Sequence, residues 1–437
     1  MKNPKTKKTI QQLAKLSRPQ VGIAYPRTRL FKRLDESAAI TWITASPGAG
    51  KTTLVSSYLE TRKLKTLWYQ VDKRDEDAPT LFHYLGLAGK QNWPRSNMSF
   101  PVLGPEYNQG LEVFALNYFE QLFSLFKKAG ILVFDNYQEL DTDSVVHQLL
   151  ARSFEQLPPH IKVIIISRST VHNQYLRLKL NGQLTELSAT ELVLDQEEAQ
   201  GILKQRELKS LVSTNANRIL EQTHGLAAGF ILALEGLKQN RPITGNLDNF
   251  ISADVFNYFI SEVFSQLEST TQEQLLFCSL MPRITSPQLS EISDLPINNL
   301  LEDLAQRNYF TVSHPGKPTV YEFHPLFREF LIDQTEKNWN HQKIQQVKIK
   351  SAELLAASSQ IEDAISLYLE AQQWLNAVKL LEEHSQTYIN EGRHRLLEQW
   401  LSLCVKRSPE QHPWINYWLA RCQVLQNPYQ SIENFTR

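Results

Sequence analysis

The most informative segment of the sequence is Ile43-Thr44-Ala45-Ser46-Pro47-Gly48-Ala49-Gly50-Lys51-Thr52-Thr53-Leu54. An apolar run at 38–43 precedes it and is typical of a buried strand, and the pattern at 53–59 is typical of an amphipathic helix. The segment follows the pattern G-x-x-x-x-G-K-[ST], except that Ala45 replaces the first glycine. Because this motif requires a strand before it and a helix after it, the sequence predicts a P-loop that binds nucleotide phosphates.

The residue types in this loop suit a phosphate chain. Gly48 and Gly50 allow the backbone to curl without side-chain clashes, so that its N–H groups and the helix N-terminus can face phosphate oxygens. Lys51 is predicted to reach the β- and γ-phosphates, and the Thr52 hydroxyl to ligate Mg²⁺. The predicted nucleotide-binding residues of the loop are Ser46, Pro47, Gly48, Ala49, Gly50, Lys51, Thr52 and Thr53.

The composition is that of a globular protein with several domains. The 437 residues exceed the size of one hydrophobic core, and about three domains are expected. Equal numbers of basic and acidic residues, 46 each, argue against a broad surface for nucleic acid. No apolar run reaches the roughly 18 residues of a membrane span, and no secretory signal is present. Cys278, Cys404 and Cys422 lack metal-ligand spacing, so we interpret them as core thiols of a cytoplasmic protein.

Three more apolar runs predict strands of a parallel sheet. They lie at 65–72, 130–136 and 162–168 and alternate with helical patterns, which is typical of a doubly wound α/β domain. The second run ends in Asp135, at the edge of the sheet where ligands bind. We predict that Asp135 is the Walker B acid, which holds Mg²⁺ directly or through water. The third run ends at Arg168, whose guanidinium suits either a γ-phosphate or the surface of the sheet.

The acidic cluster at 72–77 has two interpretations. Its four acids can form a metal site, or they can begin the next helix as a solvated and well-capped turn, which we favour. Residues 88–110 are rich in Gly, Asn, Pro and Ser and are predicted to be a loop, followed by a helix at 111–128. Residues 1–26 are predicted to be a polar arm. For its lysine-rich start at 1–8, a solvated disordered tail is favoured over an arm that binds nucleic acid or lipid.

A helical region follows the α/β domain. Residues 191–245 predict a helical bundle domain. Residues 246–335 predict helices that end in a β-hairpin at 308–312 and 319–323, which is typical of a winged helix. His324 comes directly after this hairpin, and taken alone it is expected to be a structural histidine.

The last part of the sequence predicts an array of paired helices. Within 336–437, Ala352, Ala364 and Ala377 lie at close-packed positions, as in an α-solenoid of the tetratricopeptide (TPR) kind. The chain ends inside a predicted helix, so we expect it to be a fragment of a longer protein. The predicted fold is therefore an α/β doubly wound P-loop domain at 27–190, followed by the helical bundle, the winged helix and the start of the TPR-like α-solenoid.

With these motifs in place, the chain resembles the STAND class of signal-transducing P-loop NTPases, and within it the MalT-like, LuxR-type transcriptional regulators. The resemblance covers about 19–437. Its most specific parts are the P-loop and Phe323-His324-Pro325-Leu326-Phe327-Arg328-Glu329-Phe330-Leu331, which is similar to the winged-helix signature of the family. Other segments similar to family motifs are Pro26-Arg27-Thr28-Arg29-Leu30, Phe134-Asp135-Asn136-Tyr137-Gln138, Ile166-Ser167-Arg168 and His224-Gly225-Leu226-Ala227-Ala228-Gly229.

The resemblance implies roles for three residues outside the P-loop. Arg27 would border the nucleotide, Arg168 would sense the γ-phosphate, and His324 would contact the β-phosphate of ADP and hold the winged helix against the nucleotide-binding domain. Two departures from the family bear on chemistry. Ala45 is tolerable where glycine is usual if its φ is negative, and Asn136 replaces a second acid, which weakens the case for fast hydrolysis. A third departure, Leu226 in place of tryptophan, concerns packing.

The function implied by the resemblance is a switch driven by ATP and ADP with Mg²⁺. ADP would hold a closed monomer; ATP and an inducer, bound through the helical repeats, would open it and allow self-association, with slow ATP hydrolysis as the reset. DNA would be bound only through a C-terminal region outside this chain. Two alternatives remain open: an ATPase that turns over continuously, of the motor or chaperone type, and a helical-repeat scaffold that binds nucleotide passively.

Overall fold

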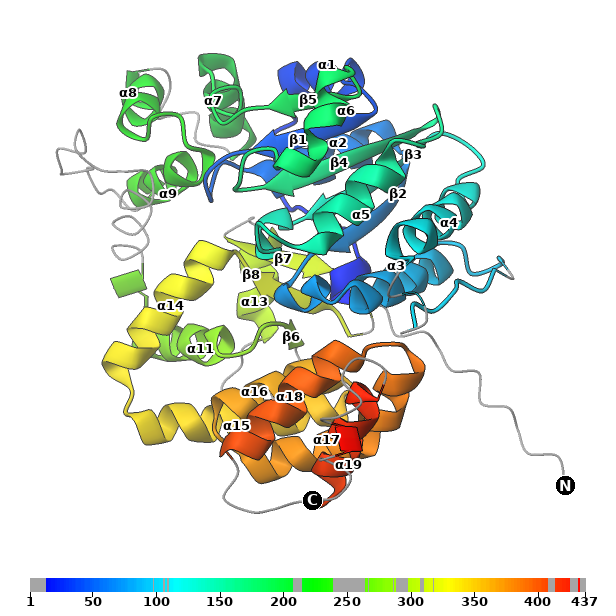
Figure 1. Cartoon of the computed structure of the whole chain (residues 1–437). Coiled ribbons are helices and arrows are strands. Elements are labelled where there is room, and N and C mark those ends of the chain that lie inside the picture. The colour runs from blue at the N-terminus through cyan, green and yellow to red at the C-terminus, as the bar shows by residue number, and fades with distance from the viewer. Residues whose placement is uncertain are drawn as a thin grey trace, which may run out of the picture.

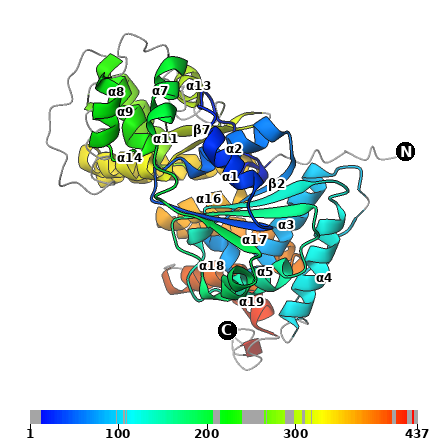
Figure 2. The same ribbon diagram turned by 90° about the horizontal axis from the view of Figure 1, so that it is seen from above.

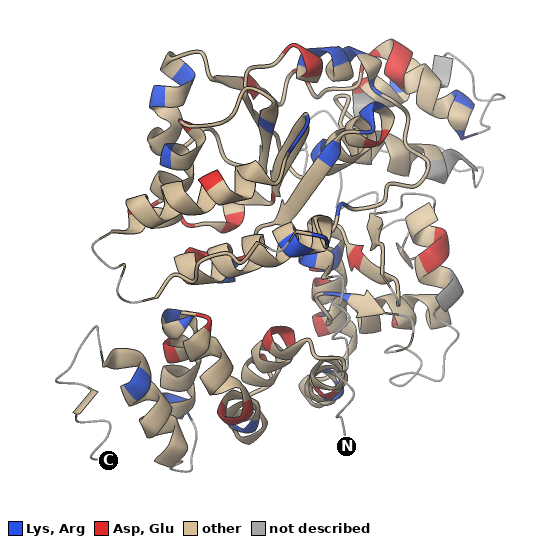
Figure 3. Cartoon of the chain, turned by 90° about the vertical axis from the view of Figure 1, so that its right-hand side faces the viewer, with Lys and Arg blue, Asp and Glu red and all other residues tan. Residues whose placement is uncertain are grey.

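The structure is a computed structural model of the whole chain. It describes residues 13–96, 98–104, 107, 110–206, 214–238, 264–265, 267–285, 287, 298–306, 310–316, 318–407, 413–424 and 431–432. Within these ranges no helix has the length and apolarity needed to cross a membrane. Charges of both signs are spread over all parts of the ribbon, in keeping with the balanced composition (Figure 3).

The nucleotide-binding domain is built on a parallel sheet of five strands in the order β2-β3-β4-β1-β5. The strands are β1 (Ile40–Thr44), β2 (Lys65–Gln70), β3 (Gly130–Asp135), β4 (Ile161–Ser167) and β5 (Leu184–Leu187). All pairings are parallel. The strands predicted at 38–43, 65–72, 130–136 and 162–168 are confirmed. β5 was not predicted, because four residues are too few to show a clear alternation.

Helices cover both faces of this sheet (Figure 1). The residues of β3 alternate: Ile131 and Val133 belong to one apolar core, and Leu132 and Phe134 to the other. The first core is completed by α1 (Thr28–Asp35) and α2 (Lys51–Arg62). The second core is completed by α3 (Ala78–Asn92), α4 (Leu111–Ser124), α5 (Val145–Phe154) and α6 (Leu176–Leu180). The sheet is thus doubly wound, as predicted; α3 extends to Asn92, into the segment predicted to be a loop.

The helical and winged-helix segments share one apolar core, which extends from Leu194 to Leu331. The helical segment contains α7 (Gln196–Gln205), α8 (Thr214–Gln222) and α9 (Ala227–Lys238), which gather at one end of the molecule, away from α4 (Figure 2). The other segment contains α11 (Ser269–Ser279), β6 (Ile284–Thr285), α13 (Asn298–Gln306), β7 (Thr311–His314), β8 (Val320–Phe323) and α14 (Pro325–Asn338). The predicted boundary at 245/246 lies outside the described residues, and the two segments are packed as one body.

The predicted hairpin is present as β7 and β8, in an antiparallel sheet with the order β6-β8-β7. The start predicted at 308 lies outside the described residues, and β7 begins at Thr311. The third strand, β6, was not predicted, because two residues leave no recognisable pattern. Helices followed by this small sheet make up a winged-helix arrangement.

The array at the C-terminal end consists of α15 (His341–Ala357), α16 (Ile361–Glu370), α17 (Trp374–Asn390), α18 (His394–Arg407) and α19 (Pro413–Gln423). It lies below the nucleotide-binding domain in Figure 1 and has a core of its own. Ala352, Ala364 and Ala377 are fully buried in it, as their small side chains predicted. Its assignment to the TPR kind stays a prediction. Of the helix predicted at the end of the chain, the structure describes only residues 431–432, which are helical.

The segment 13–26 is not a free arm, which corrects the prediction for that part of 1–26. Leu16 and Lys15 are 2% exposed within the short helix Ala14–Leu16. The Ser56 hydroxyl donates to Pro19 O at 2.6 Å, and Gln20 pairs with Ser313 of the winged helix. The polar composition concealed these contacts, since the partners of the segment lie elsewhere in the chain.

The acidic cluster caps a helical turn and a helix, as favoured, but two of its four acids, Asp75 and Asp77, are buried rather than solvated. Asp72 caps the turn Lys73–Glu76, and Asp77 caps α3. Asp75 is completely buried, with its carboxylate 2.7 Å from Lys15 Nζ. No group of three or more His, Cys, Asp and Glu side chains is arranged to hold a metal in the described ranges.

A set of buried and half-buried ion pairs, called the junction below, joins the nucleotide-binding domain to the array. Arg74 Nη1 lies 2.9 Å from Asp363 Oδ1 and 3.1 Å from Glu362 Oε2. Arg393 Nη2 lies 2.5 Å from Glu362 Oε1. The winged helix adds Arg283, whose Nη1 lies 3.6 Å from Asp363 Oδ2. The junction therefore comprises Arg74, Arg283, Glu362, Asp363 and Arg393, drawn from three parts of the chain.

Candidate nucleotide-binding site

The predicted P-loop connects β1 to α2. Gly48 and Gly50 have φ of 83° and 80°, in the left-handed region that glycine adopts without strain. A Cβ on Gly48 would also lie 2.9 Å from the Cβ of Ala228, at the start of α9. Ala45 is not among the residues with positive φ, so its methyl group costs the loop nothing.

Lys51, the first residue of α2, places its ammonium group over the loop. Its Nζ donates to Ala45 O at 2.6 Å and to Ser46 O at 3.0 Å. Burial lowers the pKa of Lys51 to about 8, against the opposing influence of Asp135. Neutral carbonyls are thus its hydrogen-bond partners, and an anion placed in the loop would gain a charged donor.

Asp135 ends β3 beside α2, and it is 3% exposed. The Thr52 hydroxyl lies 3.2 Å from both of its carboxylate oxygens, and the Asn136 N–H donates to Oδ1 at 2.9 Å. Burial raises the pKa of Asp135 to about 6. Asn136 has φ of 59°, a left-handed conformation that asparagine tolerates better than most residues. The turn at Asn136 thereby directs its N–H toward the Walker B acid.

The oxygens around Asp135 suit Mg²⁺, a hard cation that prefers oxygen ligands. The Thr52 hydroxyl and the Asp135 carboxylate are brought together, as predicted. Gln70 ends the neighbouring strand and pairs in register with Asp135. Its Oε1 atom is buried and has no hydrogen-bond partner among the residues that the structure describes, so it adds an available oxygen near the same edge of the sheet. Thr52 and Asp135 are the residues that would hold the cation.

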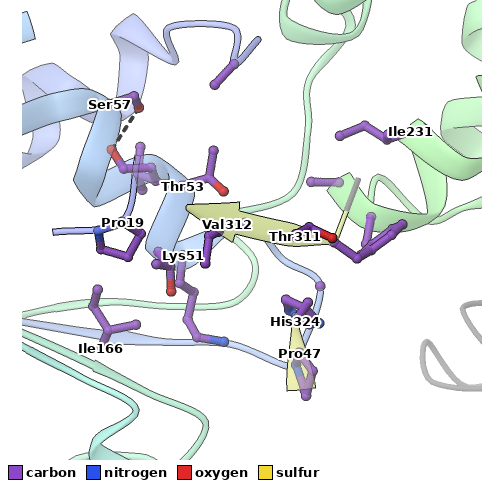
Figure 4. A pocket seen from close by; sticks show the side chains of 18 of the residues that line it. Pro19, Pro47, Lys51, Thr53, Ser57, Ile166, Ile231, Thr311, Val312 and His324 are labelled. Carbon is purple, nitrogen blue, oxygen red and sulfur yellow. Dashed lines mark hydrogen bonds between the residues drawn. The ribbon is translucent and has the colours of Figure 1, made fainter. Parts of the chain in front are cut away.

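The winged helix contributes the opposite wall of the site. His324 follows β8 and precedes α14, and its N–H donates to Phe310 O at 2.6 Å. Burial, followed by the charges of Lys51 and Arg168, lowers the pKa of His324 to about 3. Its imidazole is therefore neutral. Figure 4 shows His324 beside Pro47 of the P-loop, with the Lys51 side chain extending toward them.

One cavity of about 190 Å³, called the nucleotide cavity below, collects these residues. Its walls come from the segment 13–26, the P-loop, the ends of β2 and β3, α9 and the winged helix. The predicted residues that line it are Arg27, Pro47, Gly48, Gly50, Lys51, Thr52, Thr53, Asp135, Arg168 and His324. Ser46 and Ala49 belong to the same loop but do not line it.

The two predicted arginines are placed differently. Arg168 is exposed at the end of β4 and lines the cavity, where its charge acts on Lys51 and His324. Arg27 is buried, and its Nη2 donates to Glu198 Oε2 at 2.8 Å and to Leu192 O at 3.0 Å. Its charge is thus paired with the helical segment, and Arg27 borders the cavity as a fixed part of the wall.

Sequence reasoning missed Gln70 and Glu322, which also line the cavity. A signal was present for Glu322: in a strand, residues two apart point to the same side, so Glu322 accompanies His324. Gln70 offered none, because its place beside Asp135 depends on the register of β2 and β3.

Comparisons with known proteins agree with this architecture. Residues 260–343 match the family model of the MalT winged helix domain, and residues 26–168 match that of the nephrocystin 3 N-terminal region. The HTH-type transcriptional regulator MalT of Cronobacter sakazakii is 23% identical over 399 residues, 89% of this chain and 44% of that protein. The Vibrio cholerae MalT is 22% identical over 431 residues, 94% of this chain and 46% of that protein. The chain thus spans less than half the length of these relatives.

A solved structure agrees with the whole fold. The crystal structure of a signal transduction ATPase with numerous domains (STAND) from Pyrococcus horikoshii, with a tetratricopeptide repeat sensor, superimposes with a TM-score of 0.68 and 18% identity. The match covers 97% of this chain and 59% of that chain. Along the chain, the P-loop comes first, then the Walker B acid and then the winged helix, which is the order that the resemblance implied. These matches support the predicted resemblance of the chain to MalT-like P-loop NTPases of the STAND class.

Proposed function

We propose that the chain is a cytoplasmic switch whose state is set by ATP or ADP bound with Mg²⁺ in the nucleotide cavity. ADP favours a closed monomer; ATP together with an inducer, bound through the array, favours an open form that associates with further copies. In a longer protein, this change would control transcription through a DNA-binding region outside the present chain.

The observation that carries the proposal is the position of His324. Its imidazole and the Lys51 ammonium belong to domains more than 270 positions apart in sequence, yet both line one cavity. A ligand that touches both residues binds better when the winged helix is in place than when it is displaced. By that difference alone, such a ligand favours the closed arrangement.

The site residues have separate tasks toward the nucleotide. Lys51 and the N–H groups of the loop neutralise and orient the phosphates, while Thr52 and Asp135 hold Mg²⁺. The bound cation would supply charge neutralisation for the phosphate oxygens. His324, neutral at physiological pH, can donate one ring N–H to a phosphate oxygen. Arg168 lines the same cavity, and its proposed task is to contact a terminal phosphate.

Slow hydrolysis is favoured over continuous turnover. An acid that follows the Walker B residue could activate water, but Asn136 occupies that position and points its N–H at Asp135. A switch needs hydrolysis only as a reset, so ATPase activity is expected to be low.

The test replaces His324 with alanine. Losing a hydrogen bond to a charged phosphate costs about 1.5–3 kcal/mol, so His324→Ala should weaken ADP affinity by roughly ten- to hundredfold. It should also raise the fraction of self-associated protein while ATP still binds. Calorimetric titration with ADP and ATP, combined with light-scattering mass, measures both effects.

The exposed His341 provides a matched control, since it lies at the start of α15 and does not line the cavity. His341→Ala should bind ADP as the parent does. If His324→Ala is folded and retains both the ADP affinity and the mass of the parent, the histidine is structural and the proposed closure by ADP is wrong.

A further inference from the structure

The wing of the winged helix carries a carboxylate into the nucleotide cavity. Glu322 lies on β8, two residues before His324, so the strand directs both side chains to the same side. Glu322 and Asp135 line the same cavity from opposite domains. The Walker B acid therefore faces a second acid only when the winged helix is docked.

Glu322 is held in this position from both domains. Gln70 Nε2, at the end of β2, donates to Glu322 Oε1 at 2.6 Å. His314 Nε2, on the neighbouring strand β7, lies 3.3 Å from Glu322 Oε2. Because Gln70 pairs in register with Asp135, the contact between Gln70 and Glu322 places the wing directly beside the end of β3.

Each of the two acids has a cation nearby, but the two acids also act on each other. Burial opposes ionisation of Glu322, but His314 and Arg283 lower its pKa, so it is a carboxylate at neutral pH. Its negative charge is one of the influences that raise the pKa of Asp135. Lys51 is the cation that acts on Asp135, yet it donates its hydrogen bonds to loop carbonyls. Two like charges repel each other more strongly in a buried site than in water, so the Glu322 and Asp135 carboxylates oppose docking of the winged helix.

We propose that Glu322 makes docking of the winged helix depend on a divalent cation beside Asp135. Without the cation, the two carboxylates repel each other across the domain boundary. With Mg²⁺ held by Thr52 and Asp135, the same carboxylate is attracted to it, and closure is favoured. Glu322 is thus a positioning residue that lets the winged helix respond to Mg²⁺ as well as to phosphate. The inference rests on the proposed function, since it concerns the same site.

The donor set agrees with this role. Gln70 and Glu322 line the same cavity as Thr52 and Asp135. The Gln70 Oε1 atom, which has no hydrogen-bond partner in the described part of the chain, and the Glu322 carboxylate add oxygens to the donor set. Water molecules of a hydrated Mg²⁺ can be bound by such outer oxygens without direct coordination. A purely structural glutamate would hold Gln70 and His314 whether or not a cation is bound, and this difference can be measured.

The experiment removes the charge of Glu322 and keeps its shape, with Glu322→Gln in the full chain. ADP affinity is measured by calorimetry in excess EDTA and in millimolar MgCl₂. In EDTA the variant should bind ADP about fivefold more tightly than the parent, because the repulsion is relieved. In MgCl₂ it should bind about fivefold more weakly, because the attraction is lost; each factor corresponds to ~1 kcal/mol.

Small-angle scattering provides a readout independent of affinity. With ADP bound at saturation, Mg²⁺ should reduce the radius of gyration of the parent but leave that of Glu322→Gln unchanged. Glu329→Gln is the matched control, because Glu329 is an exposed acid on α14 outside the cavity. It should follow the parent in both measurements.

The outcomes separate the two proposals. If Glu322→Gln changes ADP affinity by the same factor with and without Mg²⁺, or not at all, Glu322 is not a cation-dependent element and this inference is overturned. The closed switch survives that result if His324→Ala still weakens ADP binding. If the parent itself binds no ADP, the proposed function fails, and the inference fails with it.

Discussion

The nucleotide cavity and the junction both contain buried charges, but they satisfy them differently. At the junction, each charged group has an opposite charge within contact distance: Arg393 Nη2 lies 2.5 Å from Glu362, and Arg74 Nη1 lies 2.9 Å from Asp363. In the nucleotide cavity, Lys51 donates to loop carbonyls, and Asp135 accepts from a hydroxyl and a backbone N–H.

This difference in pairing indicates that the junction is a structural contact and the cavity a binding site. Charges that are paired within the protein need nothing more, so the junction is a structural contact between domains. Burial opposes ionisation of Glu362, yet Arg393 and Arg74 lower its pKa to about 2, which keeps the pairs charged at neutral pH. Charges that have only neutral partners gain most from a charged ligand. The cavity is therefore where phosphate and a cation should bind.

The largest expected effect comes from breaking the junction. Arg393 is 2% exposed, and its Nε also donates to the Thr80 hydroxyl at 3.0 Å. Arg393→Ala removes the closest cation of Glu362 and leaves Arg74 as its remaining partner. Breaking a buried ion pair in this way typically costs about 3–5 kcal/mol. Urea denaturation followed by tryptophan fluorescence should show this loss. Arg395→Ala, at an exposed position two residues along, is the control and should be within about 0.5 kcal/mol of the parent. Equal stability of both variants would contradict the structural role of the junction.

The opposite result is expected in the nucleotide cavity. Lys51→Ala should weaken ADP binding by roughly ten- to hundredfold, from the loss of about 1.5–3 kcal/mol of charged hydrogen bonding to phosphate. The free energy of unfolding should not fall, because burial already disfavours the ammonium and lowers its pKa to about 8. Calorimetry and urea denaturation test the two parts. Lys32→Ala, at an exposed position on α1, is the control and should bind ADP as the parent does. If Lys51→Ala is folded and also binds ADP like the parent, the cavity does not use Lys51 for phosphate, and its contrast with the junction is wrong.

A third buried site lies outside the cavity and has no opposite charge in contact among the described residues, and it gives a smaller effect. His147 lies behind the sheet, where its Nδ1 shares a hydrogen bond with the Tyr137 hydroxyl at 2.9 Å. Burial, together with the neighbouring His172, lowers its pKa from 6.5 to about 4. The unfolded chain therefore binds a proton that the folded state resists. The stability that the folded state has with a neutral His147 is therefore fully present above about pH 6.5, and it is lost as the pH falls toward 4.

When the pH falls from 7 to 5, His147 should lower the free energy of unfolding of the parent by about 1–2 kcal/mol. His147→Asn keeps a polar side chain but cannot titrate, so its stability should depend less on pH by that amount. Urea denaturation at the two pH values measures the difference between parent and variant. The same slope in both proteins would show that His147 titrates normally.

Features recognisable in local sequence were predicted, and those created by distant contacts were not. The P-loop, Asp135 at a strand end and the hairpin before His324 each carry their signal within a few residues. The segment 13–26 was predicted to be an arm, because the partners of Lys15 come 57 or more positions later, at Asp72 and Asp75. Nothing local to Arg74 indicates that it meets Asp363, 289 residues away.

The same limit applies within the cavity. The sequence placed the phosphate-binding loop and the Walker B acid, since both are defined by spacing along the chain. It did not place Gln70 or Glu322, whose meeting across 252 positions depends on how the winged helix docks. Arg27 was predicted to border the nucleotide, and it does line the cavity, but its ion pair with Glu198 depends on the fold of the helical segment.

The most direct test of the central claim, that the cavity holds ADP in a closed monomer, is to identify the nucleotide in the purified protein together with its mass. The protein is denatured, released nucleotide is quantified by mass spectrometry, and light scattering gives the solution mass of the untreated sample. The account predicts close to one ADP per chain and a mass near the 50.4 kDa of a single chain. Protein that is free of nucleotide and does not take up added ADP with Mg²⁺ would contradict it.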